Sequence, residues 1–112
     1  QIDYDREMAF VATIEEDDKE VEIGVCRYAV NPDGESCEFA IVVADDWQKR
    51  GLARKLMGVL IETARNKGLD FMNGVFLANN ERMLKFVQSL GFVLSNDPED
   101  NSVKLGVLNL QD

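Results

Sequence analysis

The sequence predicts an α/β (α+β) fold, a mixed and mostly antiparallel sheet flanked by helices, in a single domain over residues 1–112. The first 44 residues contain three hydrophobic, partly β-branched runs separated by turn residues, which is typical of antiparallel strands. From residue 45 onward the pattern changes, because segments with helical spacing alternate with short apolar runs. A chain of this length holds one hydrophobic core, so we expect one site.

Three strands are expected first. The run Glu7–Glu16 is followed by a break at residues 17–19, and residues 20–30 supply a second strand that pairs with the first as a hairpin. The segment 31–34 is a strong turn, because Pro32 presets φ at the second position and Gly34 accepts a left-handed conformation. Residues 36–44 then resume as the third strand of an antiparallel meander.

The second half alternates helices with strands. A long amphipathic helix is predicted to end at Gly68, and its apolar face comprises Leu52, Leu56, Val59, Leu60 and Ala64. Residues 70–78 predict a strand buried on both faces, which the helical crossover makes a parallel neighbour of strand 36–44. A second helix over residues 81–90 begins at a cap, Asn79 or Asn80, and ends at Gly91. Residues 92–110 predict a short strand, an acidic turn around Pro98 and a final strand.

Charge and composition narrow the function. The chain has 21 acidic and 12 basic residues, a net charge of -9, which argues against a nucleic-acid partner and favours a cationic substrate. No apolar run is long enough to predict a membrane span. Two cysteines and no histidine give metals almost no ligands and remove the usual Ser-His and Cys-His nucleophiles. Because both cysteines are expected to be free thiols in a reducing compartment, we predict a cytoplasmic protein.

The loop before the first helix is a candidate phosphate site. Unpaired N–H groups at a helix start carry the positive end of the helix dipole and can hold a pyrophosphate. Gly51 lets a ligand approach the backbone closely, and Ala53 keeps that approach open. The alternative is structural: Asp45 or Asp46 only begins a turn, and Gly51 only fits a bend. The basic residues of the loop are Lys49, Arg50 and Arg54.

Sequence motifs in this region resemble the GNAT acetyltransferase superfamily. Gln48 through Ala53 fits its acetyl-CoA signature, Gln/Arg-x-x-Gly-x-Gly/Ala, and "LANNERMLKFVQSLGF" resembles its second cofactor-facing helix. The resemblance implies that Val42 and Val43 lie beside the pantetheine arm. It also implies that backbone amides from Gln48 to Arg54, including that of Leu52, meet the pyrophosphate. Asn80 would contact the cofactor arm, or serve only as a helix N-cap, and the two roles can coexist.

Within the superfamily, "CEFAIVVADDWQ" and "LANNERML" are most similar to the GNAT domain of bacterial protein lysine acetyltransferases. In those proteins the domain is attached to acyl-CoA-synthetase-like or cyclic-nucleotide-binding modules. The resemblance therefore implies acetyl-CoA as co-substrate, a protein lysine or a small amine as acceptor, and a fused or partner acyl-CoA-synthetase-like module. A homodimer is also consistent with it.

Glu38 is the predicted catalytic residue. Strand alternation places it with Ala40 and Val42, opposite Phe39, and a carboxylate in an apolar strand either faces water or is held for a purpose. An acceptor ammonium must lose a proton before it can attack a thioester, so Glu38 is predicted to be the general base. The structural alternative is a solvated strand residue opposite Arg27 or Lys104. A covalent role for Cys37 is a weaker alternative, because no base stands near it in sequence.

Two departures from the family pattern qualify the prediction of an acetyl-CoA-dependent N-acetyltransferase. Many members carry a Tyr on the second helix as general acid for the CoA thiolate, and the matching residue here is Val87. The family core usually begins with a strand and two helices, whereas this chain begins at the second strand. That segment is expected to be trimmed, supplied by a partner, or absent from a reduced variant. The alternative functions are a regulatory module that binds acyl-CoA without transferring the acyl group and a structural domain with a decayed pocket.

Overall fold

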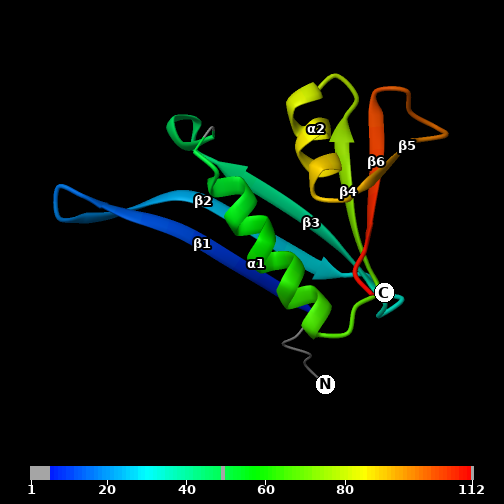
Figure 1. Ribbon diagram of the computed structural model, residues 1–112, viewed down its shortest axis with the longest axis horizontal. Coiled ribbons are helices and arrows are strands. Elements are labelled where there is room, and N and C mark those ends of the chain that lie inside the picture. Colours follow the sequence, from blue (N-terminus) through cyan, green and yellow to red (C-terminus); the bar gives the residue numbers. More distant parts are fainter. Residues whose placement is uncertain (1–5, 49, 112) are drawn as a thin grey trace.

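The structure, a computed structural model, describes residues 6–48 and 50–111 (Figure 1). The described ranges form one six-stranded sheet in the order β1-β2-β3-β4-β6-β5, with two α-helices. None of their helices is long and apolar enough to cross a membrane. In chain order the elements are β1 (Glu7–Glu16), β2 (Lys19–Val30), β3 (Ser36–Val43), the short 3-10 helix η1 (Asp45–Trp47), α1 (Leu52–Asn66), β4 (Phe71–Leu77), α2 (Glu81–Ser89), β5 (Val93–Asn96) and β6 (Val103–Asn109).

The pairing of the strands confirms the predicted mixed sheet. Only β3 and β4 pair in parallel, and the other four neighbouring pairs among the described strands are antiparallel. Asp17 and Asp18 both have positive φ, which suits the tight turn between β1 and β2. In the turn before β3, the Asp33 carboxylate accepts the backbone N–H groups of Glu35 and Ser36 at 2.8 and 3.0 Å. Both hairpin turns are therefore determined by local residues, as the sequence predicts.

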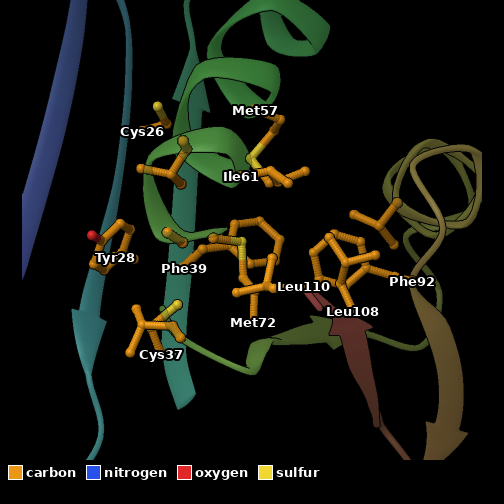
Figure 2. Packing of buried hydrophobic residues seen from close by; sticks show 14 of the residues in the cluster. Cys26, Tyr28, Cys37, Phe39, Met57, Ile61, Met72, Phe92, Leu108 and Leu110 are labelled. Carbon is orange, nitrogen blue, oxygen red and sulfur yellow. The ribbon is translucent and has the colours of Figure 1, made fainter. Parts of the chain in front are cut away.

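Both helices contribute to a core on one face of the sheet. Figure 2 shows Met57 and Ile61 of α1 packed with Phe39 and Met72 of the sheet. Val87 of α2 belongs to the same cluster and is fully buried. In the central strands, every second side chain therefore points to this face and packs in the core. The side chains between them point to the opposite face of the sheet.

Two predictions about burial are wrong. The strand over residues 70–78 was expected to be buried on both faces, but only its alternate residues are buried, and Val75 and Leu77 are 56% and 60% exposed. The physical reason is that both helices lie on the other face of the sheet. Val59, expected on the apolar face of the first helix, is 48% exposed and lies on the outer side of α1.

The two central strands part soon after they meet. β3 and β4 pair over Ser36–Glu38 and Phe71–Asn73. Beyond that point, among the strands that the structure describes, β3 pairs only with β2 and β4 only with β6. Figure 1 shows β3 and β4 close together at one end and apart at the other, with η1 and α2 at the wide end. The Phe39 ring fills the core beside the parting point, 5.2 Å from the Phe92 ring and 5.9 Å from the Phe76 ring between centroids.

Gly74 is predicted to be essential for this packing. A Cβ placed on Gly74 would lie 2.6 Å from both Phe39 Cε1 and Phe76 Cζ, so both rings must move. We expect Gly74→Ala to lower the free energy of unfolding by roughly 1–3 kcal/mol through overpacking. Gly58→Ala is the matched control, because nothing lies within 4 Å of its Cβ and Ala favours the helix interior by about 1 kcal/mol. Urea unfolding measures both, and a Gly74→Ala variant as stable as the wild type would contradict the packing argument.

Candidate active site

A cleft of about 530 Å³ lies at the wide end between the parted strands. One wall is the end of β3, the following loop and the first turn of α1, and the other wall is the start of α2. The first wall follows β3 in the chain and the second follows β4, so the two walls are separated where these strands part. The lining residues are Ile41, Val42, Val43, Gln48, Gly51, Ala53, Arg54, Asn80, Arg82, Met83 and Phe86.

The β3 wall presents backbone groups to the gap. Antiparallel pairing directs alternate residues of a strand toward and away from its partner. Hydrogen bonds at the two ends of the β2–β3 ladder, Asn31 N to Ser36 O and Ala44 N to Ile23 O, fix this alternation. The N–H and C=O groups of Val42 consequently point to β2, whereas those of Ile41 and Val43 point to the gap. The Val43 carbonyl accepts a hydrogen bond there from Gln48 Nε2 at 3.2 Å.

The loop from Gln48 into α1 is built to expose a helix N-terminus. Gly51 is the N-cap of α1 in the left-handed conformation, with φ 78°, and no side chain of the described residues caps the helix. The first four N–H groups of an α-helix lack intrahelical partners, so those of Leu52, Ala53 and Arg54 are available to a ligand. Because Gly51 has no side chain at this bend, a polyanion can approach these donors closely.

The predicted cofactor residues do not all lie in the cleft. Lys49 lies outside the residues that the structure describes. The Arg50 guanidinium stacks on the Trp47 ring at 4.7 Å instead of lining the cleft. The Leu52 side chain packs against the core. The predicted residues that do line the cleft are Val42, Val43, Gln48, Gly51, Ala53, Arg54 and Asn80.

The α2 wall contains residues that the sequence analysis did not assign to the site. Asn80 is the predicted N-cap, and its side-chain oxygen accepts the Met83 N–H at 3.2 Å. Met83 and Phe86 pack against the core, and they also line the cleft with Arg82. The signal was available, because Asn80, Met83 and Phe86 are spaced three residues apart and share one side of a helix.

Glu38 occupies a different position from the cofactor candidates. Its side chain is exposed and points to the face of the sheet opposite the helices, together with Val42. Its backbone pairs with Asn73 in the last parallel pair before the strands part, and with Ala29 on β2. The sheet register therefore places neither Arg27 nor Lys104 opposite it. Glu38 lies at the narrow end of the gap and does not line the cleft.

The two cysteines are buried and face the helices. The Cys37 side chain is fully buried, and burial raises the pKa of its thiol to about 11 from an ordinary 9.0. Burial also raises the pKa of the Cys26 thiol, which donates to the Leu56 carbonyl at 3.4 Å. A protonated, buried thiol is a poor nucleophile, which weighs against a covalent role for Cys37. Among the described residues, no group of three or more Cys, Asp or Glu side chains is arranged to hold a metal ion.

Comparisons with known proteins agree with this geometry. Residues 1–92 match the model of the acetyltransferase (GNAT) family. An acetyltransferase of Pseudomonas aeruginosa is 43% identical over 101 residues, which are 90% of this chain and 54% of the relative. The crystal structure of the GNAT domain of S. lividans PAT matches 97% of this chain and 64% of its own, with a TM-score of 0.81 and 21% identity.

A cAMP-binding acyltransferase from Mycobacterium smegmatis matches 98% of this chain and 33% of its own, with a TM-score of 0.76 and 26% identity. The chain thus spans about half of the P. aeruginosa relative and a third of this acyltransferase. The similarity covers most of this chain and a smaller share of those proteins.

The buried thiols predict a loss of stability at high pH. The Cys37 pKa is about 11 in the native state and near 9 in the unfolded chain, so its protonated form stabilises the fold fully below pH 9. This contribution, roughly 2–3 kcal/mol, is lost as the pH rises from about 9 to 11. We expect the stability difference between wild type and Cys37→Ala, measured by urea unfolding, to shrink over that range. A constant difference from pH 8 to 11 would show that Cys37 titrates normally.

Proposed function

Because the chain belongs to the acetyltransferase (GNAT) family, whose members use acetyl-CoA as co-substrate, we propose that it transfers acetyl from acetyl-CoA to an amine by direct attack. The observation that supports this is the parting of β3 and β4 directly after Glu38, with the cleft lined by the part of β3 that follows. Acetyl-CoA would place its thioester in the gap from the helix face, and the acceptor amine would reach that thioester from the open face.

The proposed cofactor site uses two sets of backbone donors. The pyrophosphate would meet the N–H groups of the first turn of α1, beside Gly51. The pantetheine arm would lie along β3 as an added strand, paired with Ile41 and Val43, whose backbone groups point to the gap. A N–H group of the same strand, such as that of Val43, would then stabilise the oxyanion of the tetrahedral intermediate. Asn80 would contact the arm through its amide while capping α2.

The proposed chemical step begins with the acceptor ammonium. Glu38 takes its proton, directly or through a water, and the amine nitrogen attacks the thioester carbon. The new C–N bond forms, the nitrogen releases its second proton to solvent, the C–S bond breaks, and the CoA thiolate leaves. Val87 stands where many family members have a Tyr acid and is fully buried, so we propose that the thiolate is protonated by water.

The proposed acceptor is a cationic amine. The net charge of -9 attracts cations to a chain whose proposed base, Glu38, is exposed on the open face. A protein lysine is the acceptor that the similarity to the bacterial protein lysine acetyltransferases favours, and a small amine is the other class. A panel of lysine peptides, polyamines and amino acids separates the two.

Acetyl-CoA is expected to raise the melting temperature. A ligand that binds only the native state at 100 times its Kd stabilises the fold by about 2.7 kcal/mol, which corresponds to a shift of several degrees. Differential scanning fluorimetry with acetyl-CoA, and with acetate as the control, measures the shift. No shift at millimolar acetyl-CoA would overturn the proposed cofactor site, whereas binding without transfer to any amine in the panel would leave a binding module.

Glu38→Gln is expected to slow acetyl transfer roughly a hundredfold while leaving the Kd for acetyl-CoA unchanged. The defect should narrow as the pH approaches the pKa of the amine, near 10.4 for lysine, because the acceptor then arrives deprotonated. Glu22→Gln is the control, since it removes an exposed carboxylate from the outer part of β2. Equal rates for Glu38→Gln and the wild type at pH 7 would remove Glu38 from the mechanism.

A further inference from the structure

Two arginines line the cleft, one on each wall. Arg54 comes from the first turn of α1, and Arg82 is the second residue of α2. Each reaches across to the opposite wall. Arg54 Nη2 donates to Ser89 Oγ of α2 at 2.7 Å, and Arg82 Nη1 donates to Gln48 Oε1 at 3.2 Å. Both arginines therefore tie α2 to the segment that follows β3.

Neither guanidinium forms an ion pair within residues 6–48 and 50–111. This is notable because acidic residues outnumber basic ones by 21 to 12 in the chain. The partners of both arginines are instead neutral side chains, which satisfy hydrogen bonds but not charge. Each arginine therefore retains a full positive charge for an anion that enters the cleft.

The position of Arg82 is electrostatically unfavourable in the absence of an anion. The first turn of a helix carries the positive end of the helix dipole, which disfavours a cation there. Glu81 precedes Arg82, but its side chain does not line the cleft. An anion between Arg82 and the start of α1 would meet two helix N-termini and a guanidinium at once.

Gln48 connects this arginine to the proposed phosphate loop. Its Nε2 donates to the Val43 carbonyl and to Asp45 Oδ1, both at 3.2 Å, while its Oε1 accepts from Arg82. A guanidinium has five donors, so Arg82 can keep this bond and still donate to a phosphate oxygen. An anion bound by Arg82 would thus lie beside the N-terminus of α1.

We infer that Arg82 binds a phosphate group of acetyl-CoA. This inference rests on the proposed function. It adds a charged side chain from α2 to the backbone N–H donors at the start of α1. The phosphate is either the pyrophosphate or the 3′-phosphate of CoA. Both offer the same chemistry to a guanidinium, and truncated ligands distinguish them.

The test measures Kd by titration calorimetry for acetyl-CoA, for acetyl-dephospho-CoA, which lacks the 3′-phosphate, and for an acetyl-pantetheine thioester, which lacks all phosphates. Arg82→Ala is expected to weaken acetyl-CoA binding roughly tenfold to hundredfold, and Arg82→Lys less. It should leave pantetheine thioester binding unchanged. If the loss persists with acetyl-dephospho-CoA the partner is the pyrophosphate, and if it disappears the partner is the 3′-phosphate.

Lys85→Ala is the control, because it removes the same charge from an exposed position on α2 that does not line the cleft. It should change the Kd less than twofold. A double-mutant cycle with Gln48→Ala tests whether Arg82 acts only by holding the loop. A direct phosphate contact predicts that Arg82→Ala still weakens binding in that background.

Three results would overturn the inference: wild-type affinity in Arg82→Ala, an equal loss for the pantetheine thioester, or disappearance of the effect in the Gln48→Ala background. Failure of the wild type to bind acetyl-CoA overturns the proposed function and this inference together. Binding by the wild type with an unaffected Arg82→Ala overturns this inference alone.

Discussion

The parting of β3 from β4 after three paired residues is the constraint on which the rest of the structure depends. The core beside it is filled, with the Phe39 and Phe76 rings packed over Gly74 where no Cβ fits. The same parting leaves the backbone groups of Ile41 and Val43 facing a gap beside the cleft between β3, the start of α1 and α2.

Most of the fold could be predicted because its signals are local. The turn at residues 31–34, the helical spacing from Leu52, the cap at Asn80 and the stop at Gly91 each depend on a few neighbouring residues, and the structure confirms them. The burial of β4 could not be predicted in the same way. Its residues are apolar on both faces, so only the placement of the two helices decides that Val75 and Leu77 are exposed.

The same difference between local and tertiary signals decides which site residues could be predicted. The loop from Gln48 to Arg54 was recognisable because its glycine and its helix start are contiguous in sequence, and most of its predicted residues line the cleft. Arg82 was missed because its partner Gln48 is 34 residues away and only the tertiary fold joins them. Met83 and Phe86 pack at the edge of the core, and a residue in that position can also form the wall of a cleft.

The sheet separates two opposite electrostatic requirements. A CoA ester is polyanionic, and it would lie on the face where Arg54, Arg82 and two helix N-termini concentrate positive charge in an acidic chain. An acceptor ammonium is attracted to the carboxylates and would approach Glu38 on the opposite face. If both reactants bound on one face, the arginines that attract the CoA phosphates would repel the acceptor ammonium. The carboxylates that attract the ammonium would repel the phosphates. On the proposed function, the gap between β3 and β4 is where the two reactants meet, since beyond Glu38 no strand pairing joins β3 to β4.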